Sequence, residues 1–333
     1  MSAQPNQPMP SRKAKRNKKR TAVKAVLLVL LFALVGTAGF AGYRYMQFNA
    51  MLNAASSGED VDIPKSESAK EKPMAMLLLG VDTRLKSGGL NTDVIMVAAL
   101  NPADKSATVV SIPRDTLIQA AGYKQHKANA YYARFHSQNK DTAGQEVKEL
   151  FGTYFGIPIT YMSIIDFTGF SRVIDNLGGV KVNVDMDMKY RDTADGTNID
   201  LRKGEQELNG QQALDFVRYR HSNDGSNPSS DFDRNERQQQ VLRQIVTKMK
   251  SGTGLLKMGS IFDSIGDNWH TDIPSKQLKN FVRAYLGISN DNITYIPIQG
   301  TWRSPYVYAD SASLEQAKQA LRDRLGASSS SAE

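Results

Sequence analysis

The sequence contains no cysteine and only four histidines among its 333 residues. No disulfide can form, and a chain of this length can bury a sufficient apolar core without one. Zinc sites in proteins are built mainly from Cys and His ligands, so a structural zinc cluster is effectively excluded. Any metal ion must therefore be held by oxygen ligands.

Motifs of two large enzyme classes are also missing. The sequence has neither a Gly-x-Ser-x-Gly nucleophile motif nor the glycine-rich Walker loop of nucleotide-binding proteins. The sequence therefore indicates neither a serine hydrolase nor a P-loop protein.

Acidic residues are absent from residues 1–24, which carry eight Lys or Arg. This charge equals the net charge of +8 of the whole chain, so residues 25–333 sum to zero. A nucleic-acid-binding domain would need a basic surface of its own. We therefore expect no nucleic-acid partner and place the basic tail beside anionic lipid headgroups.

Residues 25–43 are almost entirely apolar and contain no Lys, Arg, Asp or Glu. A run of this length can cross a membrane as one helix, and the basic tail before it predicts a cytoplasmic N-terminus. A cleaved signal peptide, with a conceivable site at 39–41, is the alternative. Either interpretation places the rest of the chain outside the cell membrane.

The remaining sequence predicts one large domain. Residues 44–72 form a polar linker, 73–326 the domain, and 327–333 a serine-rich disordered tail. Short apolar runs rich in β-branched residues predict strands at 76–81, 94–100, 108–112, 159–165, 180–184 and 293–298. Helical spacing predicts helices at 142–155, 167–177, 209–217, 233–249, 275–286 and 313–325. This order favours an α/β fold, an α/β/α sandwich around a central mixed sheet.

Short connections between the first three strands predict an antiparallel meander. Such a meander brings the end of strand one, the start of strand two and the end of strand three to one rim. The charged residues there are Asp82, Arg84, Asp93 and Arg114. Two interpretations stay open for this rim: an ordinary ion-pair cluster, or a Mg²⁺ site in which Asp82 and Asp93 hold the ion beside phosphate oxygens.

Two further clusters contain arginines that could bind a phosphate. In extended backbone Arg218 and Arg220 point to the same side, and an anion between them would offset their repulsion of about 4 kcal/mol at about 4 Å near a protein surface. On the helix 233–249, about 100° per residue places Arg234 and Gln238 on the apolar side. The same projection places Arg237 towards solvent.

These segments, in this order, resemble the LytR-CpsA-Psr family of cell-envelope proteins over about residues 73–250. The resemblance is carried by LLGVDTR at 78–84, NTD at 91–93, SIPRD at 111–115, IDF at 165–167, IDNLGGV at 174–180, LNG at 208–210, VRYR at 217–220 and DRNERQQ at 233–239.

The resemblance implies a Mg²⁺-dependent phosphotransferase of Gram-positive envelopes. Such an enzyme moves a glycopolymer, for example wall teichoic acid or capsular polysaccharide, from undecaprenyl pyrophosphate to N-acetylmuramic acid of peptidoglycan. It implies Asp82 and Asp93 as magnesium ligands, with Asp82 also counted as catalytic. It further implies that the pyrophosphate is bound by Arg84, Arg114, Arg218, Arg220, Arg234 and Gln238, of which Arg114, Arg218, Arg220 and Arg234 are also catalytic.

Several points stay open at this stage. A non-catalytic polyprenyl-phosphate-binding protein and a polyprenyl pyrophosphate hydrolase are alternative functions. The general base is not identified, with Asp115 and Asp233 as candidates. The helices 142–155 and 167–177 could wall a lipid tunnel, as the resemblance suggests, or simply pack in the core. The polar loop 221–230 is interpreted as a surface insertion or a flexible lid.

Overall fold

The computed structural model describes residues 46, 61–82, 90–193 and 196–326. The predicted tail 1–24, membrane segment 25–43 and C-terminal tail 327–333 lie outside these residues. Within the described part of the chain, no helix combines the length and apolar character needed to span a membrane. The chain divides into two units, Met1–Ala50 and Met51–Glu333, and the second unit is described below.

A mixed six-stranded sheet in the order β11-β6-β1-β2-β3-β12 forms the centre of this unit. β1 runs antiparallel to β2, and β2 antiparallel to β3, which confirms the predicted meander. β6 and β12 pair in parallel with β1 and β3 respectively. The strands span β1 Met74–Val81, β2 Thr92–Asn101, β3 Ser106–Ser111, β6 Tyr161–Asp166, β11 Trp269–Thr271 and β12 Ile293–Pro297.

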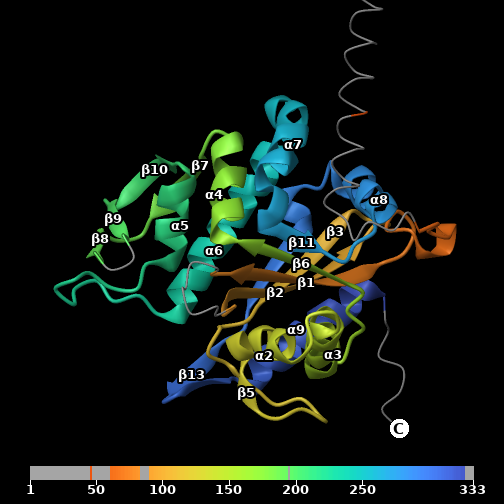
Figure 1. Cartoon of the computed structure of the whole chain (residues 1–333), viewed down its shortest axis with the longest axis horizontal. Helices are drawn as coiled ribbons and strands as arrows, with labels where there is room; N and C mark the ends of the chain where they lie inside the picture. The colour runs from red at the N-terminus through yellow and green to blue at the C-terminus, as the bar shows by residue number, and fades with distance from the viewer. Residues whose placement is uncertain (1–45, 47–60, 83–89, 194–195, 327–333) are drawn as a thin grey trace, which may run out of the picture. The chain divides into compact units, whose positions relative to one another are not determined.

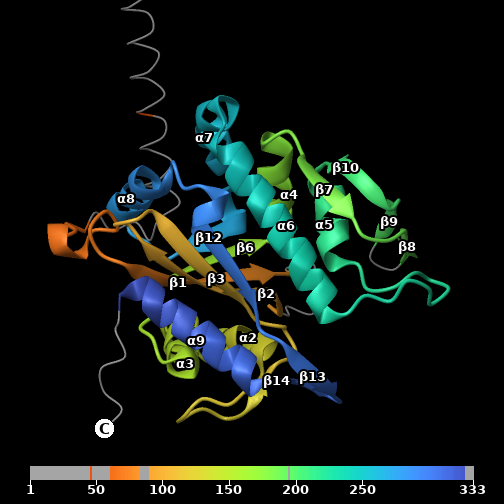
Figure 2. The ribbon, with the colours of Figure 1, turned by 180° about the vertical axis from the view of Figure 1, so that it is seen from behind.

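Helices cover both faces of this sheet (Figures 1 and 2). The lower layer of Figure 1 contains α2 Tyr131–Gln138, α3 Ala143–Phe155 and α9 Ser311–Leu325. The upper layer contains α4 Phe167–Asn176, α5 Gly210–Arg218, α6 Asp231–Lys250, α7 Gly252–Ile265 and α8 Ser275–Tyr285. The predicted α/β/α sandwich with a central mixed sheet is therefore confirmed for the described residues.

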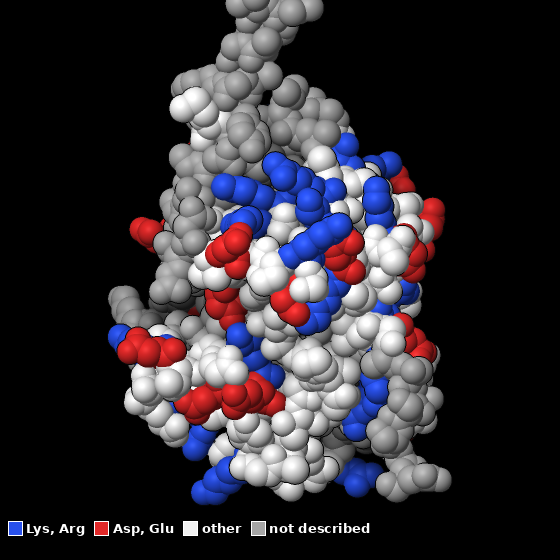
Figure 3. Space-filling model, turned by 90° about the vertical axis from the view of Figure 1, so that its right-hand side faces the viewer, with Lys and Arg blue, Asp and Glu red and all other residues white. Residues whose placement is uncertain are grey.

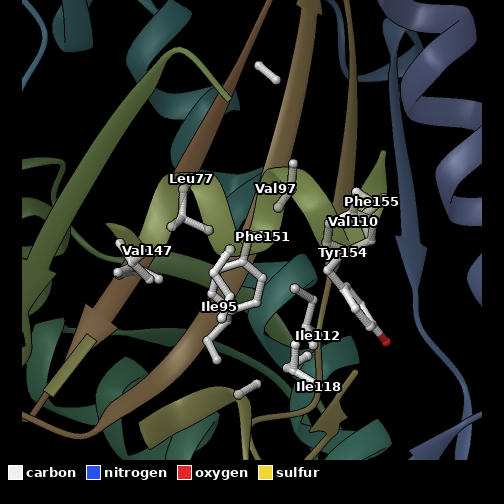
Figure 4. Close-up of a cluster of buried hydrophobic side chains, with 14 of the residues drawn as sticks. Leu77, Ile95, Val97, Val110, Ile112, Ile118, Val147, Phe151, Tyr154 and Phe155 are labelled. Carbon is white, nitrogen blue, oxygen red and sulfur yellow. The ribbon is translucent and has the colours of Figure 1, made fainter. Parts of the chain in front are cut away.

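The main apolar core lies between the sheet and the lower layer. Because successive side chains of a strand point to opposite faces, Leu77 and Leu79 of β1 enter this core together with Ile95 of β2. Phe151 and Phe155 of α3 meet them and are almost completely buried. Figure 4 shows Leu77 and Ile95 of the strands gathered with Phe151 and Phe155 of the helix.

The same packing excludes a lipid tunnel walled jointly by α3 and α4. α3 lies below the sheet and α4 above it, packed against α5 and α7 (Figure 1). Phe151 and Phe155 are core residues of the lower layer, because they are almost completely buried against the sheet.

A smaller unit beside α5 has a core of its own. It is built from β7 Val180–Val184, β8 Met188–Arg191, β9 Asn198–Leu201 and β10 Gly204–Leu208. β7 pairs with β10 and β8 with β9, and their apolar side chains pack with Phe216 of α5 and Val241 of α6. Only β7 was predicted, since the other three strands are short and rich in polar residues.

Remaining elements lie at the edges of the domain. Two small antiparallel pairs are formed by β4 Leu117–Ile118 with β5 His126–Lys127, and by β13 Gly300–Arg303 with β14 Tyr306–Ala309. Short 3-10 helices span η1 Lys65–Glu67, η2 Ala128–Ala130, η3 Gly266–Asn268 and η4 Asn290–Asn292. The side chain of Gln277 on α8 donates to the carbonyl of Glu67 and accepts from the amide of Ala69. This end of the predicted linker therefore packs onto the domain.

The face on the right-hand side of Figure 1 carries charges of both signs. In Figure 3 its Lys and Arg side chains are interspersed with Asp and Glu. No single continuous basic surface covers the described part of this face.

Candidate functional site

A β-bulge at the start of β2 sets the position of Asp93. Gly80 pairs with Val94, but the next residue of β1, Val81, pairs with Thr92, so Asp93 has no partner in the ladder. Thr92 takes the buried place opposite Val81, with only 1% of its surface exposed. Bulges of this kind change the direction of a side chain, and here Asp93 lines a pocket between the sheet and the upper layer.

Arg114 follows β3 and lies next to this carboxylate. Its Nη1 donates to Asp93 Oδ1 at 2.5 Å, and its Nε lies 3.6 Å from Asp115 Oδ2. Asp115 is also paired with Lys127 of β5, whose Nζ lies 2.9 Å from Oδ1. The meander therefore brings Asp93 and Arg114 together, as the sequence predicted.

Asp82 lies just beyond the end of β1 and is largely buried. Its Oδ2 accepts a hydrogen bond from Arg218 Nη2 at 3.5 Å. The Arg218 guanidinium also lies over the ring of Phe167, with its central carbon 4.5 Å from the ring centroid. Asp82 is thus connected to the arginine pair that was predicted to bind phosphate.

Arg218 and Arg220 both line the pocket, but the expected extended backbone at 218–220 is wrong. α5 continues to Arg218, and the buried Tyr219 caps it with φ −54° and ψ 135°. Because the chain turns at Tyr219, the two arginines reach the pocket from a helix end and from the loop that follows. The capping box of Asn209 and Gln212 at the other end fixes where this helix begins.

Arg234 and Gln238 reach the pocket from the first turns of α6. Ser230 and Asp233 form a capping box that starts the helix, and Arg234 pairs with Asp231. Both Arg234 and Gln238 lie on the side predicted from helical spacing. Burial, with the like charges of Arg220 and Arg114, lowers the pKa of Arg234 to about 9.

The prediction that Arg237 faces solvent is wrong. Only 3% of its side chain is exposed, and it forms two hydrogen bonds with Asp185, Nε–Oδ1 at 2.8 Å and Nη2–Oδ2 at 2.7 Å. Its Nη1 donates to Ser229 Oγ at 2.9 Å. Asp185, which follows β7 in the small unit, packs against this face of α6. A helical projection shows only the residues of the helix itself, so it could not predict this contact.

Together these side chains surround a cavity of about 230 Å³. Its charged and amide-bearing lining consists of Asp93, Arg114, Arg218, Arg220, Arg234 and Gln238. Restricted contact with water and the charge of Arg114 lower the pKa of Arg220. Like charges held this close favour an anion with several acceptor oxygens, because guanidinium groups bind phosphate oxygens in pairs.

The loop 221–230 is hydrogen-bonded to the small unit at several points. Asn223 accepts from the Arg191 amide at 2.6 Å and donates to the Arg191 carbonyl at 2.9 Å. Asn227 donates to the Asp187 carbonyl at 2.9 Å. His221, the first residue of the loop, lines the pocket. The loop is therefore held by hydrogen bonds to the small unit, and its first residue forms part of the pocket lining.

A sequence profile of the LytR_cpsA_psr family matches residues 40–323. The chain belongs to this family. The polyisoprenyl-teichoic acid–peptidoglycan teichoic acid transferase TagV of Bacillus subtilis (strain 168) is 30% identical over 264 residues, which cover 77% of this chain and 66% of TagV. TagU of Bacillus mycoides (strain KBAB4), which carries the same transferase name, is 31% identical over 271 residues, covering 79% of this chain and 82% of TagU.

The fold agrees with this membership. The crystal structure of B. subtilis TagV matches with a TM-score of 0.62 at 30% identity, covering 77% of this chain and 98% of the crystallised one. The LytR-CpsA-Psr chain described here thus spans just under two thirds of the length of TagV and a larger share of TagU.

Some residues of this LytR-CpsA-Psr site were not predicted. Phe167 and Tyr190 line the pocket, and Lys127 is paired with Asp115 next to it. Lys127 comes from a two-residue strand and Tyr190 from a four-residue strand, and neither has a distinctive pattern. Phe167 belongs to the IDF motif at 165–167, but nothing in that motif indicated a contact with Arg218. Arg84 lies outside the described residues, so its role stays a prediction.

The donor set of this LytR-CpsA-Psr protein fits a magnesium ion bound together with a phosphate ligand. Within the described residues, no group of three or more acidic or His side chains could hold a metal alone. Asp82 and Asp93 offer two carboxylates at the ends of neighbouring strands. Magnesium commonly takes one or two carboxylates and completes its shell with water and substrate phosphate oxygens.

Proposed function

We propose that this protein is a phosphotransferase that attaches a glycopolymer, such as wall teichoic acid or a capsular polysaccharide, to peptidoglycan. The donor would be the polymer linked to a polyprenyl pyrophosphate, and the acceptor a hydroxyl of N-acetylmuramic acid. The observation that carries this proposal is the convergence of four arginines from three separate segments on one small pocket. The names of TagV and TagU, teichoic acid transferases that act on peptidoglycan, support the same reaction.

Phosphoryl transfer needs mainly positioning and neutralisation of charge. Arg114, Arg218, Arg220 and Arg234 would hold the pyrophosphate and stabilise the charge that develops on the departing polyprenyl phosphate. Gln238 would donate a further hydrogen bond. We propose Asp82 and Asp93 as the residues that hold Mg²⁺, which would neutralise phosphate charge when bound.

The lipid part of the donor needs an apolar surface next to the arginines. On the upper face of the sheet, Met96, Ala98 and Val109 are buried, but the apolar side chains around them are only partly covered. These partly covered residues are Met76, Leu78, Val94, Leu100, Leu242, Ile293 and Tyr295. Val94 also lines the arginine pocket, so this surface would take a polyprenyl chain whose pyrophosphate lies among the arginines.

The location of the reaction follows from the N-terminal sequence. We propose that residues 25–43 anchor the protein in the cell membrane, with residues 1–24 in the cytoplasm and the catalytic domain on the cell-wall side. A polyprenyl donor is itself held in that membrane. The anchor would therefore keep the pocket within reach of its substrate.

Mass spectrometry of the purified 50–333 fragment, combined with an in vitro transfer assay, tests this proposal. We expect a co-purified polyprenyl phosphate or pyrophosphate that is lost when Arg218 and Arg220 are both changed to Ala. With Mg²⁺ and a glycan acceptor, the purified protein should join polymer to the acceptor, and Asp93→Asn should lose most of this Mg²⁺-dependent transfer.

The assay also separates the competing functions. A non-catalytic binding protein would retain the lipid and form no product. A hydrolase would release polymer phosphate equally well with and without the glycan acceptor. Either result would contradict the proposed transferase.

A further inference from the structure

The transfer reaction needs a group that accepts the proton of the attacking hydroxyl, and the structure removes both carboxylates considered from the sequence. Asp115 lies between Lys127 and Arg114, at 2.9 Å and 3.6 Å from their nitrogens. The Asp233 carboxylate accepts from the amide and hydroxyl of Ser230, at 2.7 Å and 2.8 Å. Both carboxylates are therefore already occupied by neighbouring cations or hydrogen-bond donors.

The other carboxylates around the pocket are paired as well. Asp93 accepts from Arg114 at 2.5 Å, and Asp231 is paired with Arg234. Apart from the arginines, the titratable side chains of the described residues that line the pocket are Asp93, Tyr190, Tyr219 and His221. A tyrosine is already protonated at neutral pH, which leaves the imidazole of His221.

The hydrogen bonding of His221 determines which ring nitrogen is available. Its Nδ1 lies 2.9 Å from the carbonyl oxygen of Ser222. Because a carbonyl can only accept, Nδ1 carries the proton, and Nε2 of the neutral ring is then the acceptor. The ring also meets the edge of Tyr190 at 5.9 Å between centroids.

The segment that carries this ring is held in place. The amide of Ser222 donates to Ser226 at 2.9 Å, and its side chain is hydrogen-bonded to Tyr219 at 2.9 Å. Asn223 is bonded to both backbone groups of Arg191. A residue on an anchored segment can hold its side chain in one orientation, which general base catalysis requires.

We propose that His221 is the general base of the transfer reaction, an inference that rests on the proposed function. His221 Nε2 accepts the proton of the acceptor hydroxyl while its oxygen attacks the phosphorus that bears the glycopolymer. A new oxygen–phosphorus bond forms, and the bond from that phosphorus to the bridging oxygen breaks. The polyprenyl phosphate leaves with the bond electrons, and the imidazolium later gives its proton to the leaving phosphate or to water.

Charged and titratable side chains face His221 from several elements around the pocket. They are Tyr190, Tyr219, Asp93, Arg114, Arg218, Arg220 and Arg234. The pyrophosphate of the donor would bind among the four arginines, next to the His221 ring.

The variant His221→Asn tests this role, because Asn can still donate to the Ser222 carbonyl but has no group at the position of Nε2. We expect its transfer rate to fall by about 10²–10⁴, the usual contribution of a general base, while the donor Kd and the Tm stay as in the native protein. The decline of kcat/KM at acidic pH should disappear, and added imidazole should restore part of the rate. His270→Asn, on the exposed edge strand β11, is the matched control and should be fully active.

Three results would overturn the inference. They are a native transfer rate in His221→Asn, an acidic decline that persists in that variant, and a rate loss fully explained by a weaker donor Kd. The native protein in the same assay tests the proposed function separately, because failure of the native protein to transfer polymer would contradict the transferase itself. Donor binding and transfer therefore report on the two proposals independently.

Discussion

The two faces of the central sheet differ in how completely they are covered. On the lower face Leu77 and Leu79 of β1 have 0% and 3% of their surface exposed and pack against α3. On the upper face, Met76 and Leu78 of the same strand are only partly buried, beside Leu242 of α6. One strand therefore contributes to two quite different environments, because its side chains alternate between them.

This difference separates stability from ligand binding within one domain. The lower face is an apolar core of almost completely buried side chains. The upper face combines incompletely covered apolar side chains with the cluster of arginines, which repel one another unless an anion is present. We therefore expect changes below the sheet to affect unfolding and changes above it to affect the substrate.

The largest expected effect is on the lower face. Phe151→Ala should lower the free energy of unfolding by about 3–5 kcal/mol, because it removes a fully buried aromatic side chain and leaves a cavity. Met76→Ala, on the upper face, should cost about 1 kcal/mol, since its side chain is only partly removed from water. Urea unfolding of the 50–333 fragment measures both values, and equal losses would contradict the comparison.

Arg234→Ala should reduce the rate of transfer and leave the free energy of unfolding almost unchanged. We expect polymer transfer to fall by about 10²–10³, the effect of losing one preorganised charge-stabilising group. Stability should change little, since this variant also removes a cation that repels Arg220 and Arg114. Lys248→Ala, near the other end of α6, is the control, and a native transfer rate in Arg234→Ala would disprove the assignment.

Arg237, on the same helix as Arg234, is expected to contribute to stability and not to transfer. Asp185→Ala would leave the buried Arg237 guanidinium without its carboxylate. The free energy of unfolding should therefore fall by about 2 kcal/mol, within the range for a lost hydrogen bond to a charged group. Transfer per folded molecule should stay unchanged. Thermal unfolding and the transfer assay, measured on one preparation, check both parts.

The smallest effect concerns pH. The pKa of Arg234 is lowered to about 9, so this side chain loses its charge at a lower pH than an ordinary arginine. If pyrophosphate binds only the protonated form, its apparent Kd rises about twofold at pH 9 and about tenfold one pH unit higher. Calorimetric titration with pyrophosphate measures this change, which should be absent in Arg234→Ala.

The sequence predicted elements whose periodicity extends over several residues or turns. α6 and the pocket-facing positions of Arg234 and Gln238 were predicted in this way, and the antiparallel meander was predicted from the short connections between its strands. The prediction for Arg237 was wrong because a helical projection shows only which side carries apolar residues. A second face can be covered by a polar contact, here with Asp185 of the small unit, and that contact is not visible in the pattern.

Local backbone geometry accounts for the other differences. Arg218 and Arg220 were placed correctly beside each other, but through a helix end at Tyr219 that two-residue spacing cannot distinguish from a strand. The strands β8–β10 are only four or five residues long and rich in polar residues, so they are too short for their pattern to identify them. His221 had no motif of its own, and its orientation depends on a single carbonyl of the next residue.

The bulge at Asp93 has a consequence for protein engineering. Strict alternation along β2 would have paired this aspartate with Val81 and turned it towards Ile95 and Val97, into a medium where a carboxylate cannot be solvated. Because one additional residue interrupts the ladder, the side chain at position 93 does not enter the core below the sheet. A library of substitutions at this position would therefore vary the chemistry of the pocket on an unchanged scaffold, whereas the same library two residues later would mostly yield unfolded protein.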